Sequence, residues 1–373
     1  MDLSKIPSPS YVLDESLLIK NLELLKYIQD ETGVFIICAL KGFSFHAEFP
    51  LLKKYLKGAT ASSLHEAKLV YDFMGVKPHT YCPVYIPAEF DEIRDISSHL
   101  TFNSLTQWEQ FKDKVGDVSC GLRVNPGYSE IGTPLYDPAS PASRLGIPRE
   151  KLGDELPQGI EGLHFHALCE NTSHTLERVL ERFTAAYDPL IKQAKWLNMG
   201  GGHLIPRADY DVEYGIQVLK VFKETYPNLQ EIILEPGSAI GYDTGYLVST
   251  VLDIVDNGGR KTAMLDVSFT CHMPDCLEMP YQPRIIGASM EEGRYPYHMG
   301  GCSCLAGDSM GPWYFDQPLQ RGQKIVFNDM IHYTMVKTTT FNGINLPAIG
   351  IWRNNNFELL RSFGYEDYKN RLS

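Results

Sequence analysis

The sequence predicts an α/β protein in which a TIM-like (β/α)8 barrel over residues 11–240 precedes a C-terminal antiparallel β-domain over residues 241–373. Apolar extended segments alternate with amphipathic helical segments as far as about residue 240, which is typical of parallel β/α units. There are eight strand candidates, and eight is the number of strands that closes a barrel of this type. Beyond residue 240 the chain changes to short β-branched or aromatic runs broken by glycines, which predicts a β-sandwich to which residues 1–10 could contribute.

Each barrel strand is expected where an apolar run ends in turn or helix-capping residues. Parallel neighbours need a crossover between them, and the helical segments that separate these runs can supply it. The runs lie at residues 34–41, 58–61, 79–82, 99–103, 118–125, 159–166, 195–200 and 231–235.

Several of the intervening helices have readable starts. Asp14 precedes an apolar periodic segment, Ser63 has Glu66 three residues on, and Ser104 has Gln107 three residues on. A short polar side chain followed three residues later by Glu or Gln is the pattern of a capping box. These positions therefore predict helix N-termini.

Four further segments complete the outline. Residues 175–193 carry an apolar stripe at helical spacing, which is typical of core packing. Residues 126–148 are rich in Pro and Gly and predict a long loop after the fifth barrel strand. The runs 245–251 and 322–327 predict strands of the second domain.

The composition limits the possible partners and the compartment. A formal net charge of -12 argues against nucleic acid or an anionic membrane and favours a cationic small molecule. No apolar stretch approaches the length of a membrane span, and the N-terminus lacks the layout of a signal peptide. The eight cysteines are scattered, which suits reduced thiols better than a disulfide framework. We therefore expect a cytoplasmic protein.

Lys41 ends the apolar run Val34–Leu40, which predicts a strand buried on both faces. An ammonium group at the end of so apolar a segment is costly, and burial favours the neutral amine. The neutral amine is the nucleophile that forms a Schiff base with a carbonyl. Lys41 is therefore the first candidate for a catalytic residue.

Polar residues and glycines follow several other predicted strands, at the end of a barrel where active sites lie. Taken singly, each has an ordinary structural explanation: a tight turn for the glycines, an ion pair for the glutamate, a satisfied core position for a histidine. The residues are Arg123, Asn125, His164, His166, Gly200, Gly201, Gly202, His203, Glu235 and Gly237.

Taken together, these residues indicate one cofactor. A lysine that traps an aldehyde, a glycine loop that approaches a phosphate, and a carboxylate that pairs with a ring nitrogen are what pyridoxal phosphate requires of a protein. Lys41, Gly200–Gly202 and Glu235 offer these three contributions. The predicted cofactor is pyridoxal 5'-phosphate.

A zinc site formed by cysteines is the competing interpretation for the second domain. Its ligands would come from Cys271, His272, Cys276, Cys302 and Cys304. Structural zinc sites usually show paired Cys-x-x-Cys spacing, which is missing from these residues. We therefore expect no metal.

Six short motifs resemble those of the alanine-racemase-fold pyridoxal-phosphate decarboxylases, which are enzymes of fold type III, and they occur in the same order. The nearest resemblance is to the carboxynorspermidine/carboxyspermidine decarboxylases, with ornithine and diaminopimelate decarboxylases more distant. The resemblance covers nearly the whole chain. The motifs are Ala39–Phe43, His164–His166, Gly200–Gly202, Glu235–Gly237, Cys304–Asp308, and Tyr333 with Phe341–Gly343.

The resemblance implies a lyase of spermidine biosynthesis, acting on a carboxylated triamine as a homodimer with shared active sites. Lys41 would form the Schiff base, His166 would stack on the pyridine ring, and Glu235 would pair with the ring nitrogen. Cys304 of the partner subunit would donate a proton after carbon dioxide leaves. The phosphate would be held by Gly200, Gly201, Gly202, Gly237 and Tyr333.

The chain departs from the wider family at three positions. Ser238 stands where a phosphate-binding arginine is usual, Leu305 where an aspartate often follows the cysteine, and Thr60 where an aspartate follows a strand. The distal amine of the substrate needs an acidic partner. Asp266 is the first candidate and Asp308 the second, although either could be a carboxylate in a turn or at a sheet edge.

Other functions stay open from the sequence. The enzyme could decarboxylate ornithine or diaminopimelate, or it could be a racemase, although the Cys304–Asp308 segment favours decarboxylation. A barrel protein that carries pyridoxal phosphate without turnover would lack the second domain. A cofactor-free Schiff-base aldolase would also explain Lys41.

Overall fold

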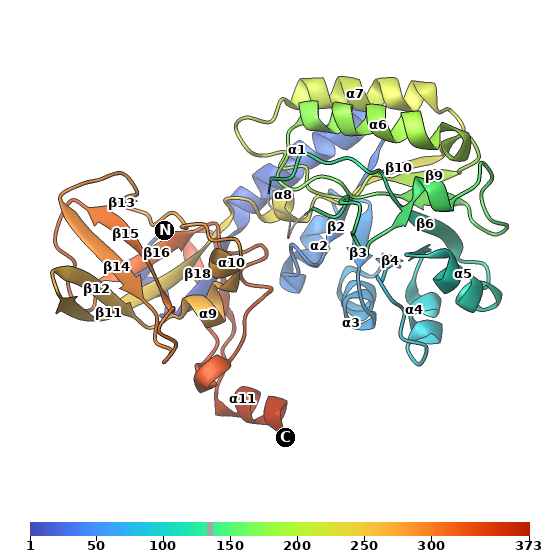
Figure 1. The fold of residues 1–373 in the computed structure, drawn as a ribbon. Helices are drawn as coiled ribbons and strands as arrows, with labels where there is room; N and C mark the ends of the chain where they lie inside the picture. The colour runs from blue at the N-terminus through green and yellow to red at the C-terminus, as the bar shows by residue number, and fades with distance from the viewer. Residues whose placement is uncertain (133–136) are drawn as a thin grey trace. The chain divides into compact units, whose positions relative to one another are not determined.

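The computed structural model describes residues 1–132 and 137–373. The chain divides into two compact units, one formed by Asn21–Ile240 and the other by Met1–Lys20 together with Gly241–Ser373 (Figure 1). Helix α1 (Glu15–Thr32) crosses the division. None of the helices in the described parts of the chain is long and apolar enough to cross a membrane.

The larger unit is a closed parallel barrel. Each strand pairs with the next around the ring, and the ring closes because β6 pairs with both β5 and β8 while β10 pairs with β2. All eight predicted strands are confirmed; β3 has the predicted bounds, and the other seven are shorter than predicted, most of all β8. They are β2 (Phe35–Ala39), β3 (Gly58–Ala61), β4 (His79–Tyr81), β5 (His99–Phe102), β6 (Ser119–Asn125), β8 (Gly162–His164), β9 (Trp196–Asn198) and β10 (Glu231–Leu234).

Helices lie between the barrel strands and begin where the capping signals predict. Asp14 accepts from the Ser16 amide, Ser63 caps α3 and Ser104 caps α5 through their side-chain oxygens. Each cap satisfies an amide that has no partner within its helix. The helices are α2 (Phe49–Leu52), α3 (Leu64–Leu69), α4 (Phe90–Ile96), α5 (Leu105–Phe111), α6 (Ser173–Ile191), α7 (Val212–Thr225) and α8 (Gly237–Gly241).

Helix α6 confirms the apolar stripe, since Leu176, Val179 and Phe183 are buried along it. It lies beside α7 on the outside of the barrel (Figure 1). The loop predicted over residues 126–148 falls partly on residues 133–136, which lie outside the described residues. At its far end, the short strand β7 (Ile147–Pro148) pairs with β6.

The smaller unit contains a nine-stranded mixed sheet. Most of its pairings are antiparallel, as the sequence predicts, but β1 runs parallel to β17 and β12 runs parallel to β14. The segment that carries helices α9 (Phe269–His272) and α10 (Pro274–Glu278) supplies the crossover between β12 and β14. The strands are β1 (Ser10–Asp14), β11 (Gly245–Asn257), β12 (Arg260–Leu265), β13 (Ala288–Ser289), β14 (Tyr295–Gly300), β15 (Ser309–Phe315), β16 (Lys324–Asn328), β17 (Ala348–Arg353) and β18 (Asn356–Arg361). Helix α11 (Tyr365–Leu372) follows the last strand.

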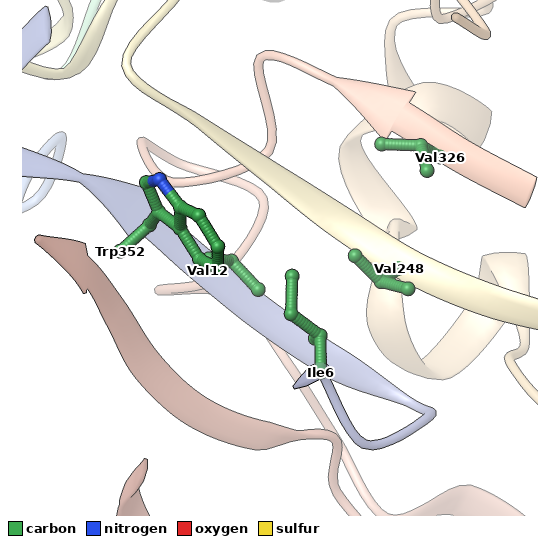
Figure 2. Packing of buried hydrophobic residues seen from close by; sticks show 5 residues of the cluster. All are labelled: Ile6, Val12, Val248, Val326 and Trp352. Carbon is green, nitrogen blue, oxygen red and sulfur yellow. The ribbon is translucent and has the colours of Figure 1, made fainter. Parts of the chain in front are cut away.

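Part of the core of this unit joins the two ends of the chain. Ile6 and Val12 pack against Val248, Val326 and Trp352 (Figure 2). Strand β1 lies between β11 and β17 in the sheet. The N-terminal segment therefore belongs to this unit as far as residue 20, whereas the sequence suggests that the barrel begins at residue 11. The reason is that strand pairing across the whole length of the chain leaves no local signal in the sequence.

Candidate active site at the barrel mouth

Lys41 lies in a tight turn that directly follows β2. The amides of Gly42 and Phe43 both donate to the carbonyl of Ala39, which closes the turn. A Cβ atom on Gly42 would lie 3.0 Å from the Gly237 carbonyl carbon, and one on Gly237 would lie 2.8 Å from the Ala39 oxygen. The two glycines thus allow the Lys41 turn and the Glu235–Gly237 segment to meet backbone to backbone.

The side chain of Lys41 is exposed, although the residues before it in β2 are buried. The expectation that Lys41 itself is buried is therefore wrong for its side chain, which a reactant can reach. Burial by the surrounding protein atoms is still the largest cause that lowers the pKa of Lys41, and the Arg123 guanidinium lowers this pKa further. Both effects favour the neutral, nucleophilic amine.

Glu235 leaves the end of β10 and has two fixed contacts. Asn198 donates to Oε1 of Glu235 at 2.7 Å, and His164 Nε2 lies 3.9 Å from Oε2. Burial raises the pKa of the Glu235 carboxyl, while hydrogen bonds from Asn198 and Thr60 lower it. The carboxylate is thus held in one orientation by a donor on the adjacent strand β9 and a second donor on β3.

His166 follows β8 and is oriented by the glycine loop. The Gly201 amide donates to Nδ1 of His166 at 2.9 Å. Burial, followed by the charges of Lys41 and Arg123, holds the pKa of His166 well below its ordinary value. The ring is therefore neutral, and because Nδ1 accepts a hydrogen bond, the proton is on Nε2.

The three glycines after β9 are required by their close contacts. An added Cβ would lie 2.6 Å from the Phe165 oxygen at Gly200, 2.3 Å from the Glu235 oxygen at Gly201 and 2.0 Å from the Leu168 oxygen at Gly202. Gly200 and Gly202 also have positive φ angles. A larger residue would push the loop away from its neighbours on both sides.

The amides of this loop are only partly available to a ligand. Gly200 donates to Oδ1 of Asn198 at 2.9 Å, and Gly201 donates to His166. Among the described residues, the Gly202 amide has no such acceptor. The amides of Gly200 and Gly201 already donate to acceptors within the barrel. Of the three glycines predicted to hold a phosphate, Gly202 is therefore the one whose amide can donate to it.

Arg123 is a buried cation at the end of β6. It is 6% exposed, and its guanidinium carbon lies 4.6 Å from the centre of the Tyr81 ring. In the parts of the chain that the structure describes, no carboxylate oxygen lies within ion-pair distance of Arg123. Its charge favours the ionised form of Glu235 and disfavours a proton on Lys41.

Two more histidines complete the lining of the barrel. His164 and His203 are buried, and neither ring has a hydrogen-bond partner among the described residues. Burial lowers the pKa of His203 to about 4. Buried polar atoms without a partner are rare in native proteins and often lie at functional sites.

Cys304 lies in the smaller unit, on an exposed loop that Asp308 holds. The Asp308 carboxylate accepts from the amides of Thr270 and Ser303, and its backbone carbonyl accepts from Gly301. The amide of Cys304 donates to Oδ1 of Asn342 at 2.9 Å. The Asn342 motif thus anchors the Cys304 loop.

The two acidic candidates for the distal amine have internal partners. Both oxygens of Asp308 accept backbone amides, as described above. Asp266 accepts from the hydroxyls of Ser8 and Ser249 and from the amide of Thr250. Both side chains therefore stabilise their own unit. The contacts of Asp266 with Ser8 and of Asp308 with Thr270 join segments that are distant in the sequence, and the sequence did not reveal them.

Tyr333 has a φ angle of 35°, which is unusual for a bulky residue. The residue that follows it is fixed, since the hydroxyl of Thr334 donates to the buried carboxylate of Asp275 at 2.7 Å. Strained backbone of this kind persists where the surroundings determine it, and it is frequent at ligand sites.

The structure gathers the barrel candidates and adds two residues that sequence reasoning missed. Lys41, His166 and Glu235 come together with Asn198 and Thr60 at the barrel mouth. Asn198 contacts both Glu235 and Gly200, and its only sequence signal is its position at a strand end. Thr60 stands where the wider family often has an aspartate, and in this structure its hydroxyl donates a hydrogen bond to Glu235.

These side chains fit pyridoxal phosphate. Lys41 supplies an accessible amine with a lowered pKa, Glu235 an oriented carboxylate, and His166 a flat neutral ring. Arg123 supplies a buried positive charge, and no carboxylate of residues 1–132 or 137–373 lies within ion-pair distance of it. An anionic, planar aldehyde satisfies all four groups at once.

Comparisons with known proteins agree with this fit. Residues 10–331 match the family described as pyridoxal-dependent decarboxylase, C-terminal sheet domain. The chain is 48% identical to the carboxyaminopropylagmatine decarboxylase of Synechocystis sp., over 99% of this chain and 96% of that relative. It is 42% identical to the carboxynorspermidine/carboxyspermidine decarboxylase of Campylobacter jejuni, over 100% of both chains.

A solved structure extends the similarity to the fold. The carboxynorspermidine decarboxylase of Campylobacter jejuni, complexed with norspermidine, has a TM-score of 0.90 at 41% identity. The comparison covers 98% of this chain and 100% of that one. The chain therefore belongs to the family of pyridoxal-dependent decarboxylases, and its cofactor is pyridoxal 5'-phosphate.

Proposed function

We propose that the protein decarboxylates carboxynorspermidine and carboxyspermidine to norspermidine and spermidine. The observation that carries this proposal is similarity over the whole chain to enzymes of that name, at 42% and 34% identity. The Lys41, His166 and Glu235 geometry supports the same chemistry. The substrate is a small cationic molecule, which suits a chain with a net charge of -12.

Lys41 would hold the cofactor through its side-chain nitrogen. When bound, pyridoxal phosphate supplies an electron sink for the pair of electrons that remains as carbon dioxide leaves. Arg123 and the surrounding protein atoms lower the pKa of Lys41, which favours the neutral amine that reacts with an aldehyde. The Gly202 amide and Tyr333 would bind the phosphate.

Glu235 and His166 would position the ring of the cofactor. Glu235 would accept a hydrogen bond from the protonated ring nitrogen, and Asn198 keeps the carboxylate aimed. His166 would stack against the ring, in an orientation held by Gly201. A carboxylate in this position favours the protonated ring, which is the better electron sink.

Cys304 would donate the proton that replaces the lost carboxylate on the α-carbon. We propose that it acts in the site of the partner subunit, in a cytoplasmic homodimer with shared active sites. Mixing Lys41→Ala and Cys304→Ala proteins tests this arrangement. Each mixed dimer then carries one intact site, so activity should return to about a quarter of the wild-type level. Two inactive proteins that stay inactive after subunit exchange would show that each chain builds its own site.

Carboxyaminopropylagmatine is the second candidate substrate. The specific observation in its favour is the 48% identity to the Synechocystis enzyme. This compound ends in a guanidinium group, whereas the carboxylated triamines end in an ammonium group. A pocket made for a planar, bidentate donor differs from one made for a point charge.

The experiment that decides between them compares kcat/KM for all three compounds on the purified protein, with ornithine and diaminopimelate as controls. We expect the carboxylated triamines to be preferred. A higher kcat/KM for carboxyaminopropylagmatine would replace the proposed substrates, and turnover of diaminopimelate alone would overturn the proposal. Discrimination between the two triamines should be modest, because one methylene is worth about 1–3 kcal/mol.

A further inference from the structure

A group of metal-ligating side chains lies inside the barrel, away from the catalytic residues. His79, His99 and Glu231 are the first residues of β4, β5 and β10, and they offer ligand atoms that all lie within 4.8 Å of one another. Lys41 follows the carboxyl end of β2, at the opposite end of the parallel barrel. The decarboxylation described above gives this group no role.

The hydrogen bonds of His99 determine which nitrogen carries its proton. The Ser98 hydroxyl donates to the carbonyl of Pro78 at 3.1 Å, and the same oxygen lies 3.1 Å from Nδ1 of His99. Since a hydroxyl has one proton, Nδ1 must be the donor in the second contact. The neutral ring of His99 therefore presents the lone pair of Nε2.

That lone pair faces a carboxylate. Nε2 of His99 lies 3.6 Å from Oε2 of Glu231. Two acceptors that face each other repel, unless a cation or a proton lies between them. Two atoms that each lie about 2.1 Å from a tetrahedral zinc ion are about 3.4 Å apart, which is close to the observed separation.

His79 supplies the third nitrogen. It pairs in register with His99 across the neighbouring strands, and the two rings stack with centroids 3.8 Å apart. The lone pairs of two stacked rings lie in nearly parallel planes and do not point at one common ion. The His79 ring must therefore turn about its Cβ–Cγ bond before both rings can bind the same ion. The Trp196 ring packs against His99 in a T-shaped arrangement, with centroids 5.2 Å apart.

We propose that His79, His99 and Glu231 bind a divalent metal ion of the zinc class. Two imidazoles and one carboxylate are the ligands that such an ion takes in a three-ligand site, with water completing the shell. The Ser98 oxygen accepts from Nδ1 of His99 and so orients the ring, a role that carboxylates, carbonyls and waters have for other metal-bound histidines. The Glu231 side chain is 32% exposed, which gives the ion a way in from solvent.

The ion would stabilise the barrel by cross-linking two strands that are not adjacent. Strands β5 and β10 are not neighbours in the ring, and hydrogen bonds between strands cannot join them. An ion bound to His99 and Glu231 links them directly. Because it binds the folded chain, it should raise the unfolding temperature. This inference does not depend on the proposed function.

The test is a zinc titration of the cofactor-loaded protein after treatment with a chelator. We expect calorimetry to give one more ion per chain for the wild type than for Glu231→Gln or His99→Gln, and zinc to raise the unfolding temperature of the wild type only. The exposed Cys302 and Cys304 thiols are present in every variant, so any zinc they bind cancels in the comparison. His65→Gln, at an exposed histidine, is the matched control and should behave as the wild type.

Two graded variants keep the inference falsifiable if the ligand variants fold poorly. Ser98→Ala should weaken zinc binding about 10–100-fold by freeing the His99 ring. His79→Gln should weaken it by at least about tenfold if the third nitrogen binds. Equal numbers of bound ions in the wild type and Glu231→Gln, or equal zinc-induced shifts in unfolding temperature, would overturn the site. A proton shared by His99 and Glu231 would then account for their approach.

Discussion

The amide of Gly201 donates to Nδ1 of His166 at 2.9 Å, and an added Cβ on the same glycine would lie 2.3 Å from the carbonyl oxygen of Glu235. One backbone unit thus orients the ring that would stack on the cofactor and touches the segment that bears the carboxylate. The loop after β9 serves the site through its shape as well as through any phosphate contact.

Gly201→Ala should therefore separate the His166 ring from the Glu235 segment. We expect a loss of about 1–3 kcal/mol in the free energy of unfolding, as for other overpacked sites, and a weaker hold on pyridoxal phosphate. Chemical denaturation and a fluorescence titration with the cofactor measure the two effects. Gly153→Ala is the matched control, because a Cβ at Gly153 meets no atom of the described residues within 4 Å. Unchanged cofactor affinity in Gly201→Ala would contradict the orienting role.

Asn198→Asp tests whether Asn198 controls the pKa of the Glu235 carboxyl. The variant keeps an oxygen for the Gly200 amide but removes the donor to Glu235 and adds a like charge. Burial already raises the pKa of Glu235 and the Asn198 donor lowers it, so this pKa should rise further, by about one unit or more. More of the carboxyl is then protonated at a given pH, and the acidic limb of the kcat/KM profile should move to higher pH. A limb that stays in place would mean that Asn198 does not set this ionisation.

Arg123→Gln tests the electrostatic control of Lys41. The buried guanidinium lowers the pKa of Lys41, so its loss should raise that pKa. Pyridoxal phosphate should then attach to the apo protein only at a higher pH, which its visible absorbance measures. Activity should fall at least about tenfold. Arg123→Lys keeps the charge and should retain most of the pH dependence. Identical pH profiles for the wild type and Arg123→Gln would remove Arg123 from this role.

Asp308→Ala tests whether the carboxylate holds the Cys304 loop. Hydrogen bonds to charged groups contribute about 1.5–3 kcal/mol each, and Asp308 accepts two backbone amides, so stability should fall by at least about 1.5 kcal/mol. KM for the triamine should change little compared with kcat, because the carboxylate faces its own loop. Asp316→Asn, at an exposed position, is the control. A large rise in KM with unchanged stability would instead place Asp308 against the substrate amine.

Local patterns were sufficient for much of the fold and for part of the site. The alternation of apolar runs with capped helices predicted all eight barrel strands, and the strand ends at Lys41, His166 and Glu235 predicted where the reactive groups lie. These features depend on neighbours in sequence: strands bury runs of apolar residues, and helices begin at capping side chains. In a parallel barrel the strand ends then converge without further information.

Other contacts required the tertiary structure, because they join residues far apart in the chain. No local pattern predicts the pairing of β1 with β17, the contact of Asp266 with Ser8, that of Asp308 with Thr270, or that of Asn198 with Glu235. The exposure of Lys41 is also a product of packing, since a strand end can be covered or open depending on the loops around it. The sequence alone thus determined which elements form and where reactive side chains gather. Only the folded chain decided which of their hydrogen bonds are already satisfied, because that depends on groups brought together from distant segments.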